Sequence, residues 1–419
     1  MFLSWFDSNA LAATVPAFLV CFTLTSLFLG IASYVGVFVA QHYGARQYQQ
    51  IGAVTWQGFY IVVLSLLVVV PVFIFMESLF RMIGHDPAIQ VMEVSYARIF
   101  ILSIPVMIVS GALSGFFSGI GRTSVVMWSN LLITLVNIAL DYALIFGNWG
   151  MPEMGVAGAA LASVIALVVG TLLQLWIFFA PEYRQRFKTH QNWLFHSKLF
   201  KRLMKFGFPV GIQFQLQSLA WTMFVLLIGK IGVIELTAHS IAMNVFIMAV
   251  MPMTGMSIAV SVLVGQRLGG SDPDSAERAT LSAVHLAAVF FAFAGLLMVV
   301  RPDWFIEPFA KGMDLAMYQA AVPLVENLLR LVALFCIFES VSMMMAGALK
   351  GAGDTRFVAW VGISSMWLLL VLPTALLVYI WGGNLIWSWV FFVLNGITIC
   401  LLYWLRFRAA RWKLLQVTM

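Results

Sequence analysis

Eleven long runs of predominantly apolar residues constrain this chain more than any other feature of its sequence. Each run has at least roughly the 20 residues that an α-helix needs to cross the hydrocarbon core of a bilayer, and each is too long for a barrel strand. A helix also satisfies all of its backbone polar groups within one segment. The runs lie at 11–40, 51–76, 92–118, 124–147, 155–180, 206–230, 236–266, 279–300, 320–349, 357–381 and 385–405.

The composition agrees with these spans. Apolar residues make up 62% of the 419 residues, and charged residues make up only 10%. A soluble domain has no way to keep that much apolar surface from water. We therefore predict an all-α integral membrane protein with eleven transmembrane helices, surrounded by the lipid bilayer.

The distribution of lysine and arginine predicts the orientation of the helices. If the N-terminus lies outside and the spans alternate, seventeen of these cations fall on the inside, four fall on the outside, and Arg98 and Arg330 lie within spans. This bias is the positive-inside pattern, so the C-terminus is expected in the cytoplasm. The net charge of +6 therefore reflects membrane topology, and no nucleic-acid partner is predicted.

Several kinds of chemistry have no support in the sequence. The three cysteines, Cys21, Cys336 and Cys400, lie inside apolar runs and show neither a metal-ligand spacing nor a disulfide framework. The segment GAGDT lacks the Lys-Ser/Thr of a phosphate-binding loop, and no nucleophile triad or zinc site is recognisable. We predict that the protein is not an enzyme, has no catalytic residues and has no bound cofactor.

An internal repeat divides the chain. VAQHYGA at 39–45 matches VGQRLGG at 264–270, and GFFSGIGRT at 115–123 matches GALKGAGDT at 347–355. Two copies with the same direction through the membrane require an even number of helices per unit, here six. The expected divisions are an N-lobe at 1–180, a basic cytoplasmic linker at 181–205, and a C-lobe at 206–419 with a basic tail.

The first copy has five helices, because no counterpart of the helix at 206–230 precedes it. Two explanations are open: the full protein begins upstream with one more helix, or this helix has been lost. We favour the first explanation, because an unpaired half-interface in a helix bundle would be difficult to satisfy.

Two acidic residues lie well inside spans. A carboxylate in hydrocarbon costs at least about 2.5 kcal/mol, so such residues usually face an internal cavity and have a function. Asp141 and Asn137 are four residues apart and share one helix face. Their oxygens suit Na⁺, and the carboxyl group could instead carry a proton. The alternative is that Asp141 is a span-end residue that hydrogen-bonds to a neighbouring helix.

Glu339 lies near the middle of its span, and Gln217 is a polar residue inside the span at 206–230. Both are candidates for a cation or substrate site in the second copy. The alternative for Glu339 is a buried acid with an interior hydrogen-bond donor. For Gln217 it is a helix–helix hydrogen bond, which is the commoner role of a buried amide in a membrane protein.

The segments 236–270, 347–357 and 137–162 resemble the multidrug and toxin extrusion (MATE) family, and the resemblance extends over essentially the whole chain. It implies a twelve-helix, V-shaped, two-lobe transporter of two pseudo-symmetric six-helix bundles. In the family, an asparagine and an aspartate on the fifth helix match Asn137 and Asp141. Alignment places Gln217 where Na⁺-driven relatives have a carboxylate, and Glu339 at or near the acid of the tenth helix. The family's first-helix acid has no counterpart here.

The resemblance implies an antiporter of the bacterial inner membrane, working as a monomer, that exports organic and often cationic compounds in exchange for Na⁺ or H⁺ by alternating access. Two alternatives remain open from the sequence. One is a flippase for a lipid-linked or amphipathic substrate, which would need a more cationic cavity than Arg98 and Arg330 provide. The other is a truncated remnant that does not transport.

Overall fold

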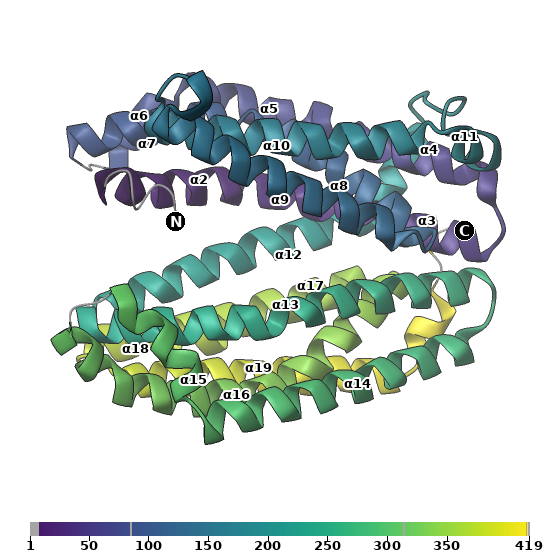
Figure 1. Ribbon diagram of the computed structural model, residues 1–419. Helices are drawn as coiled ribbons and strands as arrows, with labels where there is room; N and C mark the ends of the chain where they lie inside the picture. Colours follow the sequence, from purple (N-terminus) through teal and green to yellow (C-terminus); the bar gives the residue numbers. More distant parts are fainter. Residues whose placement is uncertain (1–7, 84–85, 313–314, 416, 418–419) are drawn as a thin grey trace. The chain divides into compact units, whose positions relative to one another are not determined.

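The computed structural model describes residues 8–83, 86–312, 315–415 and 417, and these residues form helices and no strands (Figure 1). The predicted all-α class is therefore confirmed. Apolar side chains on all faces of these helices give lipid-exposed surfaces, and the backbone polar groups are satisfied within each helix. Large apolar side chains such as Leu67, Trp176 and Phe293 are more than 60% exposed, as expected for residues that contact lipid.

Ten helical segments of the described chain are long and apolar enough to cross a membrane, and a bent helix pair raises this number to eleven. The prediction of eleven spans is confirmed when the pair, bent by 42°, is counted as one span. In the first half the spans are formed by α2 (Ser8–Ser33) with α3 (Val35–Gly44), α4 (Tyr48–Phe59) with α5 (Ile61–Ile74), α7 (Pro87–Phe100) with α8 (Ser103–Gly119), α9 (Thr123–Phe146), and α10 (Gly155–Phe178).

The remaining spans follow in the same order as the sequence predicts. They are α12 (Ser197–Gly229), α13 (Val233–Gly269), α14 (Pro273–Val300), α16 (Leu315–Ala352), the segment of α17 (Thr355–Ser365), η3 (Met366–Val371) and α18 (Leu372–Ile380), and α19 (Leu385–Arg408). Short helices connect them: α6 (Met76–Ile83), η1 (Asn148–Gly150), α11 (Pro181–Phe187), α15 (Asp303–Ile306), η2 (Glu307–Gly312) and η4 (Arg411–Leu414).

The start of α12 differs from the predicted span. The helix begins at Ser197 rather than at 206, so its first turns fall within the segment predicted as a linker. Leu203 is buried there while Lys201 and Lys205 are exposed, which is the pattern of an amphipathic helix. A search for uniformly apolar runs misses such turns because their charged face lowers the mean hydropathy.

The chain forms two compact units, Met1–Gln215 and Leu216–Met419. The boundary between them falls inside α12. Unit 1 has its own buried core, which includes Phe38, Phe116 and Phe178. Unit 2 has a core of its own around Phe224, Phe291 and Trp389. The divisions at 180 and 205 expected from the repeat stay predictions.

The backbone reproduces the internal repeat at two corners. After α3 and after α13, Arg46 and Ser271 both adopt a left-handed conformation with φ of 59°. The N–H groups of the next residues reach back five positions, to His42 at 2.9 Å and Arg267 at 2.8 Å. Gly121 and Gly353 occupy equivalent left-handed positions at the other matched corner, with φ of 80° and 105°. The matched blocks therefore encode the same helix-ending turns, which close with the long-range hydrogen bond typical of helix C-termini.

Glycines of α8 allow a close approach to α2 and α3. A Cβ atom on Gly115 would lie 2.7 Å from the Gly36 backbone nitrogen, and one on Gly119 would lie 2.7 Å from the Val39 side chain. Gly111 faces Leu29. The four-residue spacing of these glycines thus marks a helix–helix seam, as is usual for small residues in membrane helices.

One ion pair in unit 2 is largely shielded from solvent. The Nε atom of Arg406 lies 2.7 Å from Oδ2 of Asp354, with side chains only 28% and 10% exposed. At the repeat-equivalent position of unit 1 stands Arg122, whose partner is Glu182 at 3.4 Å, and both of these side chains are more than half exposed. The two corners therefore carry opposite charges and each has its own counter-ion.

This difference in exposure leads to a prediction. Asp354→Asn is expected to lower the free energy of unfolding by roughly 2 kcal/mol, because Arg406 would keep its charge without a counter-ion in a poorly hydrated site. Glu182→Gln, which breaks the exposed pair, is expected to cost less than about 1 kcal/mol. Thermal unfolding of the two purified variants in one detergent tests the comparison. Equal losses for the two variants would contradict it.

Candidate functional site

Helix α9 carries Asn137 and Asp141 one turn apart, and it ends at Gly147, which has φ of 70°. Asp141 is half-buried, and its Oδ1 atom is buried without a hydrogen-bond donor among the residues that the structure describes. A buried acceptor without a donor is costly and needs an explanation. This oxygen therefore remains available to a cation or a proton.

The neighbouring helix α10 supplies a third polar group. The Asn137 amide Nδ2 donates a hydrogen bond to the Ser163 hydroxyl at 3.3 Å. The two helices pack closely here, because Gly158 has no side chain and lies against the backbone of Leu144. With its nitrogen directed to Ser163, the Asn137 amide keeps its carbonyl oxygen as a ligand. Ser163 was not among the sequence candidates, since a serine in an apolar helix is too common to signal a site.

Helix α7 contributes Tyr96, which lies within electrostatic range of Asp141. Tyr96 of α7 is 6% exposed and interacts electrostatically with both Asp141 and Cys21. The Cys21 thiol in α2 donates a weak hydrogen bond to the Ala97 carbonyl at 3.8 Å. The side chains described in interaction with Asp141 include Tyr96 and no arginine or lysine.

Unit 1 contains a second acid, Glu93, which is buried and was not among the site residues predicted from the sequence. Glu93 lies at the start of the predicted span 92–118, a position that indicates a span-end residue. In the structure it is fully buried, because α7 begins at Pro87 and places Glu93 one and a half turns inside the helix. Glu93 shares a helix face with Tyr96 and Ala97, the residues that lie near Asp141 and Cys21. A helical projection that began at Pro87 would have identified it.

Glu339 lies in unit 2 on α16. Its Oε2 atom accepts a hydrogen bond from the Ser342 hydroxyl at 3.0 Å. Its electrostatic neighbours are Cys336 on the same helix and Cys400 and Tyr403 on α19. This carboxylate therefore faces α19 within the unit and has a hydrogen-bonded, neutral environment.

Gln217 lies on α12 and is half-buried. The adjacent Leu216 carbonyl accepts a hydrogen bond from the Trp367 indole at 3.2 Å, which fixes this turn of α12 against the π-helical segment η3. No hydrogen bond in the described chain joins Gln217 to Glu339. The structure therefore joins Asn137 to Ser163 and places Asp141 one turn from Asn137 on α9, but it keeps the two candidates of unit 2 on separate helices.

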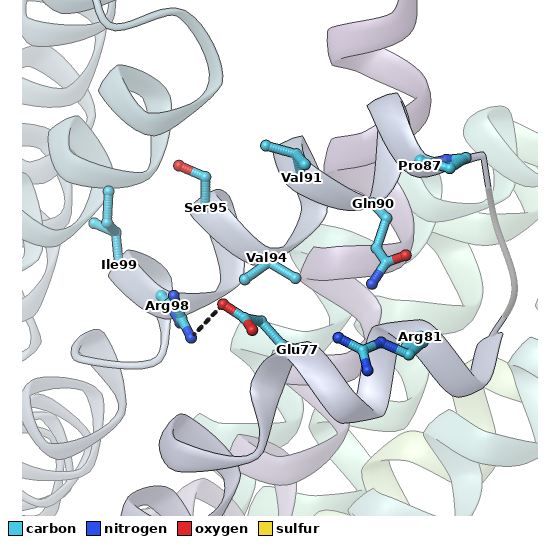
Figure 2. A pocket seen from close by; sticks show the side chains of 9 residues that line it. All are labelled: Glu77, Arg81, Pro87, Gln90, Val91, Val94, Ser95, Arg98 and Ile99. Carbon is cyan, nitrogen blue, oxygen red and sulfur yellow. Dashed lines mark hydrogen bonds and ion pairs between the residues drawn. The ribbon is translucent and has the colours of Figure 1, made fainter.

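A cavity of about 580 Å³ lies between α6 and α7 (Figure 2). Figure 2 shows Glu77 and Arg81 of α6 facing Gln90 and Arg98 of α7, with an ion pair of 2.9 Å between Glu77 and Arg98. The other lining residues are Pro87, Val91, Val94, Ser95 and Ile99. Arg98 was one of two span arginines, and here its charge is neutralised by Glu77. None of the four predicted site residues lines this cavity.

The described residues contain no cluster of three or more His, Cys, Asp or Glu side chains that could bind a metal ion. Na⁺ does not require such a cluster, because it binds amide, hydroxyl and carboxylate oxygens, which are hard ligands. Asn137, Asp141 and Ser163 provide one of each kind.

Comparison with known proteins gives consistent results. The family model described as MatE matches residues 1–143 and 209–377. The multidrug resistance protein NorM of Burkholderia vietnamiensis is 29% identical over 80% of this chain and 72% of its own length. The probable multidrug resistance protein NorM of Bradyrhizobium diazoefficiens is 27% identical over 96% of this chain and 86% of its own length.

Solved structures share the fold. One, described as the outward-facing conformation of a multidrug resistance MATE family transporter, has a TM-score of 0.86 at 20% identity and covers 98% of this chain and 90% of its own. A eukaryotic MATE transporter has a TM-score of 0.83 at 20% identity over 98% of this chain and 90% of its own. Similarity at this level of identity establishes the architecture of the helices.

Proposed function

The chain belongs to the MATE family, and from this premise we propose that it is a secondary active multidrug efflux transporter driven by Na⁺ or H⁺. Members of the family are transporters and not enzymes, and this chain is a multi-pass protein of the inner membrane. Its substrates are small organic molecules, as the names of its NorM relatives indicate for those proteins. The observation that carries the proposal is Asp141, a carboxylate with a buried oxygen that accepts no hydrogen bond within the described chain.

Asp141, Asn137 and Ser163 are proposed as the coupling site. A cation bound between them neutralises Asp141 and completes the coordination of its buried oxygen. An organic cation drawn to the same carboxylate competes with the coupling ion, so each ligand favours a different state of the protein. Differential binding to two states is the requirement for exchange of the two ligands.

Glu339 is proposed to provide a second cation or substrate site in unit 2, with Gln217 of α12 as a further polar group of that unit. The orientation with a cytoplasmic C-terminus is proposed from the positive-inside distribution, and a monomer is proposed because each unit has a complete apolar core of its own.

The decisive experiment uses the purified full chain in vesicles loaded with a fluorescent organic cation. An inward gradient of either Na⁺ or H⁺ is expected to drive efflux, and dissipation of that gradient with an ionophore is expected to stop it. Efflux that requires neither gradient would refute the antiport mechanism. Translocation of a labelled lipid in place of the dye would indicate a flippase.

The role of Glu339 gives a separate prediction. Glu339→Gln is expected to lower the initial rate of efflux by about tenfold, because the amide keeps a hydrogen bond to Ser342 but removes the charge. Ser342→Ala is the matched control: it removes the hydrogen bond and keeps the charge, so a change of less than about threefold is expected. A larger effect of Ser342→Ala than of Glu339→Gln would assign Glu339 to helix packing.

A further inference from the structure

The segment 189–196, which joins α11 to α12 within unit 1, is attached to α4 by a series of hydrogen bonds. The Gln57 side chain is fully buried and uses both ends of its amide, donating to the Leu194 carbonyl at 3.2 Å and accepting from the His196 N–H at 3.2 Å. Three further bonds join Trp56 to the Thr189 carbonyl at 2.7 Å, Tyr60 to the Trp193 carbonyl at 2.7 Å, and Asn192 to the Gln49 carbonyl at 2.9 Å. The backbone of this segment is therefore fixed along α4.

Three consecutive large apolar side chains project outward from this fixed backbone. Trp193 is 55% exposed, Leu194 is 58% exposed and Phe195 is 53% exposed. Phe195 also contacts the rings of Tyr60 and Phe200, with ring centroids 5.3 and 5.1 Å apart. A connecting loop in water would be destabilised by three such neighbours, so their exposure requires an apolar environment.

The position of these side chains along α4 indicates what that environment is. The span Tyr48–Ile74 has 27 residues, which gives a length of about 40 Å at 1.5 Å per residue. A hydrocarbon core is about 30 Å thick, so about 10 Å of the span projects beyond it. Gln57 and Tyr60 lie about 13 and 18 Å from Tyr48. If all of the excess length projected at this end, Gln57 and Tyr60 would lie only about 3 and 8 Å inside the hydrocarbon. The segment bound to them therefore lies near the boundary between headgroups and acyl chains.

Cations flank the apolar triplet in the sequence. Between residues 181 and 205 there is one acid, Glu182, and seven lysines or arginines: Arg184, Arg186, Lys188, Lys198, Lys201, Arg202 and Lys205. Lys198, Lys201 and Lys205 are exposed and, at spacings of three and four residues, lie on one face of α12. Such a face beside inserted aromatic side chains complements the negative surface of a leaflet that contains anionic lipid.

We propose that residues 189–205, the linker anchor, form a binding site for anionic phospholipid. Trp193, Leu194 and Phe195 enter the boundary between headgroups and acyl chains, and Lys198, Lys201 and Lys205 bind the phosphate groups. The hydrogen bonds from α4 hold the triplet in the inserted position, so little conformational freedom is lost when lipid binds. The site is independent of ion coupling at Asp141.

Insertion is tested with an environment-sensitive fluorophore on Leu194→Cys in the full chain. The three native cysteines are buried, so labelling is selective. In vesicles of phosphatidylcholine and phosphatidylglycerol, we expect quenching by brominated lipid and protection from aqueous iodide. Gln185→Cys, an exposed position on α11, is the control and is expected to be quenched by iodide. Equal iodide quenching of both labels would overturn the proposal.

Headgroup recognition is tested by charge removal. The triple variant Lys198→Gln, Lys201→Gln, Lys205→Gln is expected to lose about fivefold in affinity for labelled phosphatidylglycerol per cation removed. The matched triple variant Arg278→Gln, Arg356→Gln, Arg411→Gln removes three exposed cations of unit 2 and is expected to bind as the parent does. Equal losses in both variants would refute a defined site. Because Asp141→Asn should leave lipid binding unchanged, failure of the transport proposal and failure of this one are distinguishable.

Discussion

Asp141→Asn is expected to abolish gradient-driven efflux while the protein still folds and inserts. The substitution preserves the shape of the side chain and removes the charge that a coupling ion and a cationic substrate would share. Removal of an interaction that contributes about 3 kcal/mol to the driven step corresponds to a loss on the order of a hundredfold in its rate. Drug resistance of cells that express the variant, and dye efflux from vesicles, measure this loss.

The control for Asp141→Asn is Asp303→Asn, which removes an exposed acid that pairs with Arg301 at 2.9 Å. This variant is expected to transport at the parent rate, since an exposed pair contributes little. Expression level and elution volume in detergent should be the same for both variants. Full efflux by Asp141→Asn would eliminate the coupling role of this carboxylate.

Gly115→Ala is expected to have the largest effect on stability. Its new Cβ atom would lie 2.7 Å from the Gly36 nitrogen and 3.2 Å from the Gly36 Cα, and both of these are backbone atoms that no rotamer change can move. Helices α3 and α8 must separate, so the free energy of unfolding should fall by about 3 kcal/mol, the upper part of the usual range for overpacking.

The matched substitution for Gly115→Ala is Gly255→Ala in α13, where an added Cβ meets no atom within 4 Å. Because alanine is favoured over glycine inside a helix, a gain of about 0.5–1 kcal/mol is expected there. Thermal unfolding of both purified variants provides the comparison. If the two alanines changed the melting temperature in the same direction, the close contact between Gly36 and Gly115 would not be a determinant of stability.

Long apolar runs predicted the spans well because a helix in lipid has no competing structure. The turns of the repeat were also predictable, since Arg46 and Ser271 follow matching sequences and adopt the same left-handed conformation. The start of α12 and the helix α6 were not predicted. In both, charged residues alternate with buried ones such as Phe80 and Leu203, and the average over a window hides the pattern.

The candidate site shows where sequence reasoning reaches its limit. The shared face of Asn137 and Asp141 follows from helix geometry alone. The contact between Asn137 and Ser163 depends on how far α10 is displaced along α9, which the close packing at Gly158 decides. The burial of Glu93 depends similarly on neighbouring helices. Local spacing predicts which side chains share a face, but it does not predict what lies opposite that face.

The opposite charges at Arg122 and Asp354 mean that a loop of one repeat cannot simply be grafted into the other. If the loop GFFSGIGRT replaced GALKGAGDT, an arginine would stand against Arg406, and two cations would meet where an ion pair now holds the corner. A successful graft would have to carry the counter-ion as well. The two counter-ions come from different elements, Glu182 from α11 and Arg406 from α19, so neither corner can take the place of the other without its own partner.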